Sequence, residues 1–455
     1  MKFLSYLPTV KRPVERRLSF NVKLKWTLII LIAFFILSNI PLYGLTENAL
    51  QRFEYLSLVL GARFGSLMSL GIGPIVTASI ILQLLVGSKL LNIDLTKKEG
   101  RKLFEGLQKL LAILFCFFEA TIFVLMKGLQ AQAGLEWLVI LQLFLGGLLV
   151  IYMDEVVSKW GFGSGVSLFI LAGVAESLFV RTFGFVGPSF QAGNETLRFS
   201  FQPSGAVPVL VRSIIEQDIA GAKVVIGSLI ATIVVFLIVV YTQGIKVEIP
   251  LSFARLRGLS LRWPLEFFYT NVIPVILISA LLANIQLGAS LLEKTGKIDA
   301  ESLAPWLSGP GGKDGLLGMI LKANSFAIGI RPYLQALFYL LVMIAGSALF
   351  AYLWMRTSGM DPKSQAEQIM ASELHIPGFR KDQRVIETIL NRYIPVLTIL
   401  GGAAVGFLAA FADLGGALVR GTGLLLAVMI VYRLYQEISR EHALDMHPAL
   451  RKFIG

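Results

Sequence analysis

The sequence has little of the chemistry on which disulfides, metal sites and enzymes depend. Its 455 residues include one cysteine and three histidines, and only 15% of its residues are charged. The single Cys116 excludes a disulfide framework within the chain. The histidines, which are His375, His442 and His447, occur without the spacing of metal ligands. We therefore predict no metal and no cofactor.

The glycine-rich loops of nucleotide-binding enzymes are also missing. Gly312-Lys313 is followed by Asp314 and lacks the Ser or Thr of a phosphate-binding loop. The stretch from Gly161 to Gly165 lacks the spacing of a dinucleotide loop and instead predicts a tight turn into a helix. No catalytic constellation remains, so the sequence predicts a protein that is not an enzyme.

Apolar residues dominate what is present. Hydrophobic residues make up 55% of the chain, which is typical of a polytopic membrane protein rather than a soluble domain. A run of about 20 apolar residues can cross a bilayer as a helix. Ten such spans are predicted, at Trp26–Gly44, Ile72–Leu91, Phe104–Met126, Leu135–Met153, Gly165–Val180, Gly221–Tyr241, Phe267–Leu292, Ile330–Met355, Tyr393–Phe411 and Thr422–Tyr435. The predicted fold class is all-α.

Basic residues indicate how the chain is oriented. The net charge is +12, and most lysines and arginines lie before the first span or in alternate loops. Cytoplasmic segments of membrane proteins carry such an excess. We expect a multi-pass protein of the cell (plasma) membrane with both termini in the cytoplasm.

Ten spans divide into two sets of five. Because each set has an odd number of spans, the second set enters the membrane upside down relative to the first, which is an inverted-repeat arrangement. We predict an N-terminal half, residues 1–182, and a C-terminal half, residues 183–455, around a central pore.

The run from Asn48 to Leu91 cannot be one ordinary span. Its first part, Gln51–Ser66, carries the charged residues Arg52, Glu54 and Arg63. Each charge at bilayer depth costs roughly 2.5 to 3.5 kcal/mol. Gly71–Pro74 then break the helix, and irregular backbone at this depth survives only inside protein or beside water. We predict a half-helix folded into a cavity, followed by a full span that lines the cavity.

Two cytoplasmic loops are longer than the topology requires, and long ordered loops tend to be functional. The first, residues 243–266, predicts a β-hairpin with Arg255 and Arg257 at its tip. The second, residues 357–392, contains the basic residues Arg380 and Lys381. The two loops together would form a basic platform for an RNA-rich or acidic partner. The alternative is that their charges serve membrane orientation alone.

Several motifs together resemble one family over nearly the whole chain. They are LGIGPIVTASIILQLLVGS from Leu70, DEVVSKWGFGSGVSLFI from Asp154, VEIPL from Val247, IPVI from Ile273, ANIQ from Ala283, MDPKS from Met360, PGFRK from Pro377 and GTGLLL from Gly421. The chain resembles SecY, the family of large channel subunits of the Sec protein translocase. PGFRK stands where bacterial members usually read PGxRPG, so the resemblance is to the archaeal and eukaryotic branch and favours a ribosome over a SecA motor.

This resemblance implies a pore closed by a ring of aliphatic side chains. The ring residues are Ile72, Val76, Val166, Ile170, Ile276 and Leu426. Ile72 and Val76, like Val166 and Ile170, are i and i+4 pairs that share one helix face. Aliphatic side chains bind neither ions nor water, so a narrow ring blocks ions yet spreads around a polypeptide. The alternative is that these residues only pack the interior.

The resemblance also implies a plug and a lateral gate. The plug is the half-helix 51–66, with Gln51, Arg52, Glu54, Arg63 and Ser66. The gate lies between the second and third spans on one side and the seventh and eighth on the other, with the polar residues Thr77, Glu119 and Asn284. Glu119 in an apolar helix needs a partner, and Thr77 or Asn284 can supply it; alternatively Glu119 serves helix packing only. Lys109 in the same span is expected to snorkel.

The sequence therefore favours a passive protein-conducting channel that passes unfolded polypeptides across the membrane and releases apolar segments sideways into the membrane lipids. By resemblance its partners are a SecE-type subunit, a Sec-beta-type subunit and a ribosome with its nascent polypeptide, with RNA contacted only through the ribosome. A secondary transporter of small solutes also fits inverted repeats and a broken helix. A membrane scaffold without a pore is a third possibility.

Overall fold

The computed structural model describes residues 8–14, 18–45, 65–87, 90–93, 98–125, 129, 131–185, 187–189, 198–200, 205–253, 260–270, 273–293, 305–312, 314–323, 328–371, 374–375 and 382–446. Helices account for most of these residues, as predicted. The chain forms two compact units. Unit 1 comprises Met1–Ala175 and Ile430–Gly455, and unit 2 comprises Glu176–Met429.

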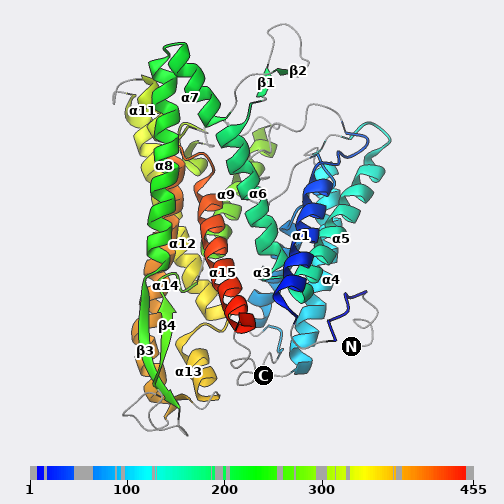
Figure 1. Ribbon diagram of the computed structural model, residues 1–455, viewed down its shortest axis with the longest axis vertical. Helices are drawn as coiled ribbons and strands as arrows, with labels where there is room; N and C mark the ends of the chain where they lie inside the picture. Colours follow the sequence, from blue (N-terminus) through cyan, green and yellow to red (C-terminus); the bar gives the residue numbers. More distant parts are fainter. Residues whose placement is uncertain are drawn as a thin grey trace. The chain divides into compact units, whose positions relative to one another are not determined.

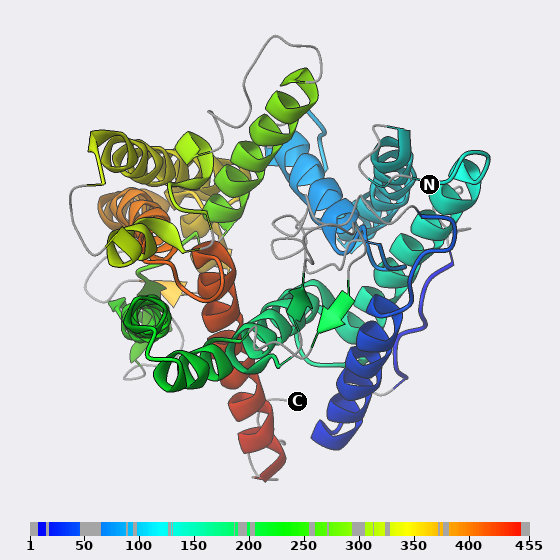
Figure 2. The same ribbon diagram turned by 90° about the horizontal axis from the view of Figure 1, so that it is seen from above.

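Unit 1 is a bundle of helices. Its elements are α1 (Phe20–Ser38), α3 (Gly73–Gly87), α4 (Lys98–Leu125), α5 (Glu136–Trp160), the first part of α6 (Gly165–Phe183) and the last part of α15 (Gly421–Met446). Helix α4 packs between α3 and α5, and α1 runs along α5 (Figures 1 and 2). A buried cluster that includes Leu70, Cys116 and Leu143 holds the bundle together.

Two adjacent glycines allow the closest approach in unit 1. A Cβ atom on Gly146 would lie 1.8 Å from the carbonyl oxygen of Leu67, and one on Gly147 would lie 2.1 Å from Cys116 Sγ. Small residues of this kind let backbones meet in membrane bundles, where close packing replaces the hydrophobic driving force. Helix α5 is thereby pressed against both α4 and the chain that leads into α3.

Unit 2 is organised around its longest described helix, α14 (Gln383–Leu414). Its other described helices are α7 (Ala206–Ile215), α8 (Ile219–Gln243), α9 (Ile273–Glu293), α11 (Gly315–Ala323), α12 (Ile330–Thr357) and α13 (Pro362–Ala371), together with the last part of α6 and the first part of α15. Helices α8, α9, α11, α12 and α13 each contact α14 (Figure 1). Gly402 and Gly406 of α14 face α12, where an added Cβ would come within 2.6 Å of Ala351 and 2.4 Å of the Met343 carbonyl oxygen.

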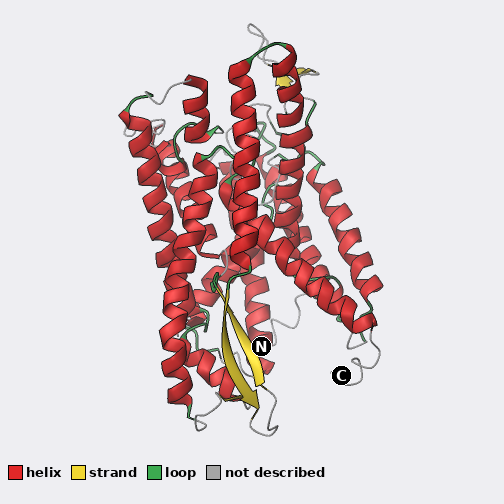
Figure 3. Ribbon diagram, turned by 60° about the vertical axis from the view of Figure 1, so that its left-hand side comes forward, coloured by secondary structure: helices red, strands yellow, loops and turns green. Residues whose placement is uncertain are grey.

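The described residues of unit 2 also form five short strands. Strands β1 (Gly187–Ser189) and β2 (Arg198–Ser200) form a hairpin, while β3 (Lys246–Phe253), β4 (Ser260–Glu266) and β5 (Leu374–His375) form an antiparallel sheet in the order β4-β3-β5. The two sheets lie at opposite ends of this unit (Figures 1 and 3). The predicted hairpin in the loop 243–266 is confirmed. The β1-β2 hairpin and the pairing of β5 with β3 were not predicted.

A described helix lies at each of the ten predicted spans. By length and composition, seven helices among the described residues are able to cross a membrane. Helix α3 has 15 residues, which at about 1.5 Å per residue is shorter than the span predicted there. Other helices run past their apolar spans into charged turns, such as Lys98–Arg101 before the third span. In these helices the hydrogen bonding continues beyond the apolar run. In contrast, α1 ends at Ser38, before the end of its predicted span at Gly44, and α9 begins at Ile273, after the start of its predicted span at Phe267.

Candidate functional site

The chain breaks before α3, as predicted from Gly71–Pro74. Residues 65–72 form turns, Gly71 has a φ of +52°, and α3 begins at Gly73. The carbonyl of Ile72 accepts the N–H groups of Ile75 and Val76, each at 3.1 Å. Pro74 fits this first turn because its missing N–H would have no helical partner there. Ile72 is 2% exposed and Val76 is half-buried.

The other ring residues of the prediction also lie near helix starts. Val166 is half-buried and Ile170 is buried, both in α6. In unit 2, Ile276 is half-buried in the first turn of α9, and Leu426 is buried in α15. The structure therefore places five of the six residues on the expected helices and Ile72 in the turn directly before α3. Their joint role as a ring remains a prediction.

The turn before α3 is tied to the end of α1. The N–H of Leu42 donates to the Gly65 carbonyl at 2.8 Å, and the N–H of Leu67 donates to the Ile40 carbonyl at 3.0 Å. Ser66, the last residue of the predicted plug, is buried and pairs with Pro41. The remaining plug residues, Gln51, Arg52, Glu54 and Arg63, lie outside the described residues.

Part of the predicted lateral gate is described. A side-chain hydrogen bond joins Thr77 of α3 to Glu119 of α4, which is one of the two partners expected for Glu119. Both residues are half-buried. The side chain of Asn284 lies outside the described part, so the pairing across the gate remains a prediction.

The two long loops of unit 2, residues 243–266 and 357–392, share one hydrophobic core, which we call the platform core. It is formed by Ile249, Leu251, Leu265, Met355, Ala366, Ile369, Ile386, Leu390, Ile394 and Leu397. Alternation along β3 turns Ile249 and Leu251 inward and leaves Glu248 and Pro250 exposed. These residues come from β3, β4, α12, α13 and α14, so the loops are joined to the helices of unit 2.

A half-buried tyrosine just after the first loop adds a polar link to the second loop. The hydroxyl of Tyr269, three residues after β4, donates a hydrogen bond to the Met360 carbonyl at 2.8 Å. The basic residues predicted at the loop tips, Arg255, Arg257, Arg380 and Lys381, lie outside the described residues.

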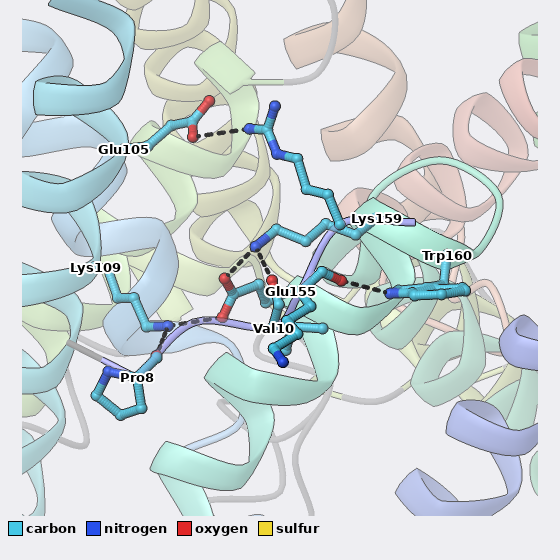
Figure 4. Close-up of polar contacts among 9 residues, drawn as sticks. Pro8, Val10, Glu105, Lys109, Glu155, Lys159 and Trp160 are labelled. Atoms are coloured by element: carbon cyan, nitrogen blue, oxygen red, sulfur yellow. Dashed lines mark hydrogen bonds and ion pairs between the residues drawn. The ribbon is translucent and has the colours of Figure 1, made fainter. Parts of the chain in front are cut away.

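An unpredicted polar cluster holds the N-terminal strap, residues 8–12, against unit 1 (Figure 4). The Glu155 carboxylate accepts from Lys109 at 2.7 Å and from Lys159 at 2.6 Å. The same ammonium groups donate to the carbonyls of Pro8 and Val10, each at 2.6 Å. Trp160 completes the cluster: its indole N–H donates to the backbone carbonyl of Lys11 at 3.0 Å. Lys109 is thus paired rather than snorkelling, because a carboxylate and a carbonyl lie within its reach.

Replacing Glu155 with Gln is expected to loosen this strap. The three charged side chains are between 11% and 19% exposed, and removing one partner of such a buried pair costs about 3 kcal/mol. We expect a lower unfolding temperature and faster trypsin cleavage after Lys11. Glu105→Gln is the matched control, because the Arg12–Glu105 pair is exposed and contributes about 0.5 kcal/mol or less. Equal behaviour of the two variants would contradict the prediction.

Two family models match the chain in succession. Residues 66–435 match the SecY model, and residues 32–65 match the model described as the plug domain of Sec61p. The second match contains most of the segment predicted to be the plug. Together the two matches run from the middle of α1 into α15.

Curated relatives and solved structures agree with these models. The protein translocase subunit SecY of Methanothermobacter thermautotrophicus is 46% identical over 99% of this chain and 97% of its own. A solved structure described as a protein conducting channel is 40% identical, with 98% of each chain covered and a TM-score of 0.78.

Sec61 in the canine ribosome-channel complex from the endoplasmic reticulum is 40% identical, again over 98% of each chain, with a TM-score of 0.75. The predicted archaeal and eukaryotic branch is confirmed by these likenesses. The chain therefore belongs to the SecY family.

Proposed function

We propose that this chain is the pore-forming subunit of a protein-conducting channel in the plasma membrane, where it passes unfolded polypeptides and releases apolar segments into lipid. The observation that carries this function is the full-length match to a protein conducting channel at 40% identity. The chain is a channel subunit and not an enzyme. The inverted halves 1–182 and 183–455 are part of the proposal.

The proposed ring consists of Ile72, Val76, Val166, Ile170, Ile276 and Leu426, and it supplies the seal. Its support is the burial of Ile72, Ile170 and Leu426 together with the aliphatic character of all six residues. A narrow aliphatic constriction excludes ions by dewetting and leaves no polar group to hold a passing chain. Residues 51–66 act as the plug, and Thr77, Glu119 and Asn284 act as polar residues of the lateral gate.

The proposed partners are a ribosome with its nascent polypeptide, a SecE-type subunit and a Sec-beta-type subunit. Support for the ribosome comes from the canine relative in a ribosome-channel complex and from the four basic residues at the loop tips, Arg255, Arg257, Arg380 and Lys381. Basic side chains neutralise RNA phosphates, so binding should weaken as salt rises. The shared platform core packs residues of both loops together.

Proteoliposomes that contain the channel complex and ribosomes bearing secretory nascent chains test this function. We expect polypeptide to become protected inside the vesicles, and we expect Arg255→Glu, Arg257→Glu and Arg380→Glu combined to weaken ribosome binding at least tenfold, which is about 1.4 kcal/mol. Arg212→Glu is the matched control, because Arg212 is exposed on α7 and pairs locally with Glu216. Saturable flux of a small solute without polypeptide passage would instead support the secondary transporter.

A further inference from the structure

In unit 1, a carboxylate from one helix caps the start of the next. Asp154, near the end of α5, accepts the N–H of Val166 through Oδ1 at 2.9 Å. The first residue of α6 is Gly165, where an added Cβ would lie 2.5 Å from the Cα of Asp154. Only glycine allows this approach, so the carboxylate lies directly against the first turn of the helix that carries Ile170.

In unit 2, a second carboxylate does the same. Asp413, near the end of α14, accepts the N–H of Gly421 through Oδ1 at 2.8 Å. Its Oδ2 accepts the hydroxyl of Tyr339 at 2.6 Å, which fixes the carboxylate from α12. A Cβ on Gly421 would lie 2.1 Å from the Ala409 carbonyl oxygen. The first turn of α15, which carries Leu426, is therefore held against α14.

The two arrangements share the same parts, although the aspartate lies 11 residues before the glycine in unit 1 and 8 residues before it in unit 2. The capped N–H belongs to the residue after the glycine in unit 1 and to the glycine itself in unit 2. In each, an aspartate near the end of one helix caps a following helix that starts with glycine. In each, a residue of the proposed ring lies at the fifth position after that glycine, Ile170 after Gly165 and Leu426 after Gly421. Such a correspondence is what inverted repeats produce when both copies keep one device.

A cap of this kind determines the position of a helix as well as its stability. An aspartate that accepts an N-terminal N–H stabilises a helix, because that N–H has no acceptor within the helix itself. Because the aspartate belongs to a neighbouring packed helix, it also fixes the rotation and height at which the new helix begins. A slip by one residue would turn the ring side chain by about 100° and move it by about 1.5 Å.

We propose that Asp154 and Asp413 are matched positioning residues that aim Ile170 and Leu426 at the pore. This inference rests on the proposed function, since it takes these two aliphatic residues as parts of the ring. The aspartates contact neither the passing polypeptide nor the ions. They act through the first turns of α6 and α15.

The test compares substitutions at each aspartate in the complete channel complex, with Cys116 replaced by Ala. Single cysteines at positions 168 to 172 and 424 to 428 report which side chains a water-soluble thiol reagent reaches, and ion leakage is measured in parallel. Asp154→Ala and Asp413→Ala should shift the labelled positions by one residue and raise leakage about tenfold. Asp154→Asn and Asp413→Asn should restore both, because the amide oxygen accepts the same hydrogen bond.

A purely structural role predicts a different result. In that case alanine would lower the unfolding temperature but leave the labelled positions unchanged, and this outcome would overturn the inference. If an alanine variant does not fold, Asp154→Glu and Asp413→Glu are tested instead. The longer side chain keeps the charge but displaces the first turn of the capped helix, so we expect more ion leakage than from the Asn variants. Equal leakage from the Glu and Asn variants would overturn the inference.

The ring itself is tested separately with Ile170→Ser. If this variant does not leak ions while Asp154→Ala still shifts the labelled positions, Asp154 positions α6 but Ile170 is not part of a pore ring. If Ile170→Ser leaks ions and Asp154→Ala leaves the labelled positions unchanged, Ile170 is part of the pore ring but Asp154 does not position it.

Discussion

Replacing Ile72, Val76 and Ile170 together with serine is expected to make the resting channel leak ions at least tenfold faster. A buried aliphatic side chain of this size contributes about 1.5 to 3 kcal/mol of apolar transfer free energy, and each 1.36 kcal/mol removed from a barrier raises a rate about tenfold. Hydroxyl groups would let water and then ions enter the constriction. Halide flux from loaded vesicles, or conductance in a planar bilayer, measures the effect.

The control for this variant is an equal change on an outer helix face. Ile230, Ile233 and Leu237 of α8 are 55%, 57% and 58% exposed. Replacing them with serine also exchanges three aliphatic side chains for hydroxyl groups, but away from the proposed ring. We expect no added leakage from that control. If the ring variant also leaves ion leakage unchanged, the membrane scaffold without a pore becomes the better explanation.

Gly147→Ala is expected to destabilise unit 1 by about 2 kcal/mol, as overpacking commonly does. The new Cβ would meet Cys116 Sγ at 2.1 Å, whereas the next atoms lie at 3.4 Å and 3.6 Å, which are ordinary contacts. Cys116→Ala removes the clashing sulfur. In that background Gly147→Ala should be neutral or stabilising by up to about 1 kcal/mol, because alanine favours the helix over glycine.

Gly146→Ala is the matched comparison and should not be rescued. Its Cβ would lie 1.8 Å from the backbone carbonyl oxygen of Leu67, which no side-chain substitution removes. We expect a loss of about 3 kcal/mol with or without Cys116→Ala. Thermal unfolding in detergent of all the single and double variants measures the coupling. Additive effects of Gly147→Ala and Cys116→Ala would contradict the predicted contact.

The parts of the fold that depend on local patterns could be predicted. Apolar runs located the ten helices, Gly71–Pro74 located the break before α3, and Gly161–Gly165 located a turn in which Gly163 has a φ of +66°. The alternation around Val247 and Ile249 predicted the hairpin. Each of these signals lies within a few residues of the feature that it specifies.

Features made by distant partners could not be predicted. The strap depends on the carbonyls of Pro8 and Val10, and backbone carbonyls carry no sequence signal. The spacing of Glu155 and Lys159 does predict a pair on one helix face, but it does not reveal that Lys109 joins the pair from α4. Asp154 stands in a motif of the resemblance, yet its hydrogen bond to α6 appears only in three dimensions.

The pairing of β5 with β3 makes the two long loops of unit 2 mechanically one body. Strand β5 joins the hairpin at Ser252 and Phe253, and the platform core fastens the sheet to α12, α13 and α14. A load applied by a bound partner to either loop is therefore divided between both and enters α14, which contacts most helices of the unit. A partner that binds at one loop tip would thus transmit force to all the helices that contact α14.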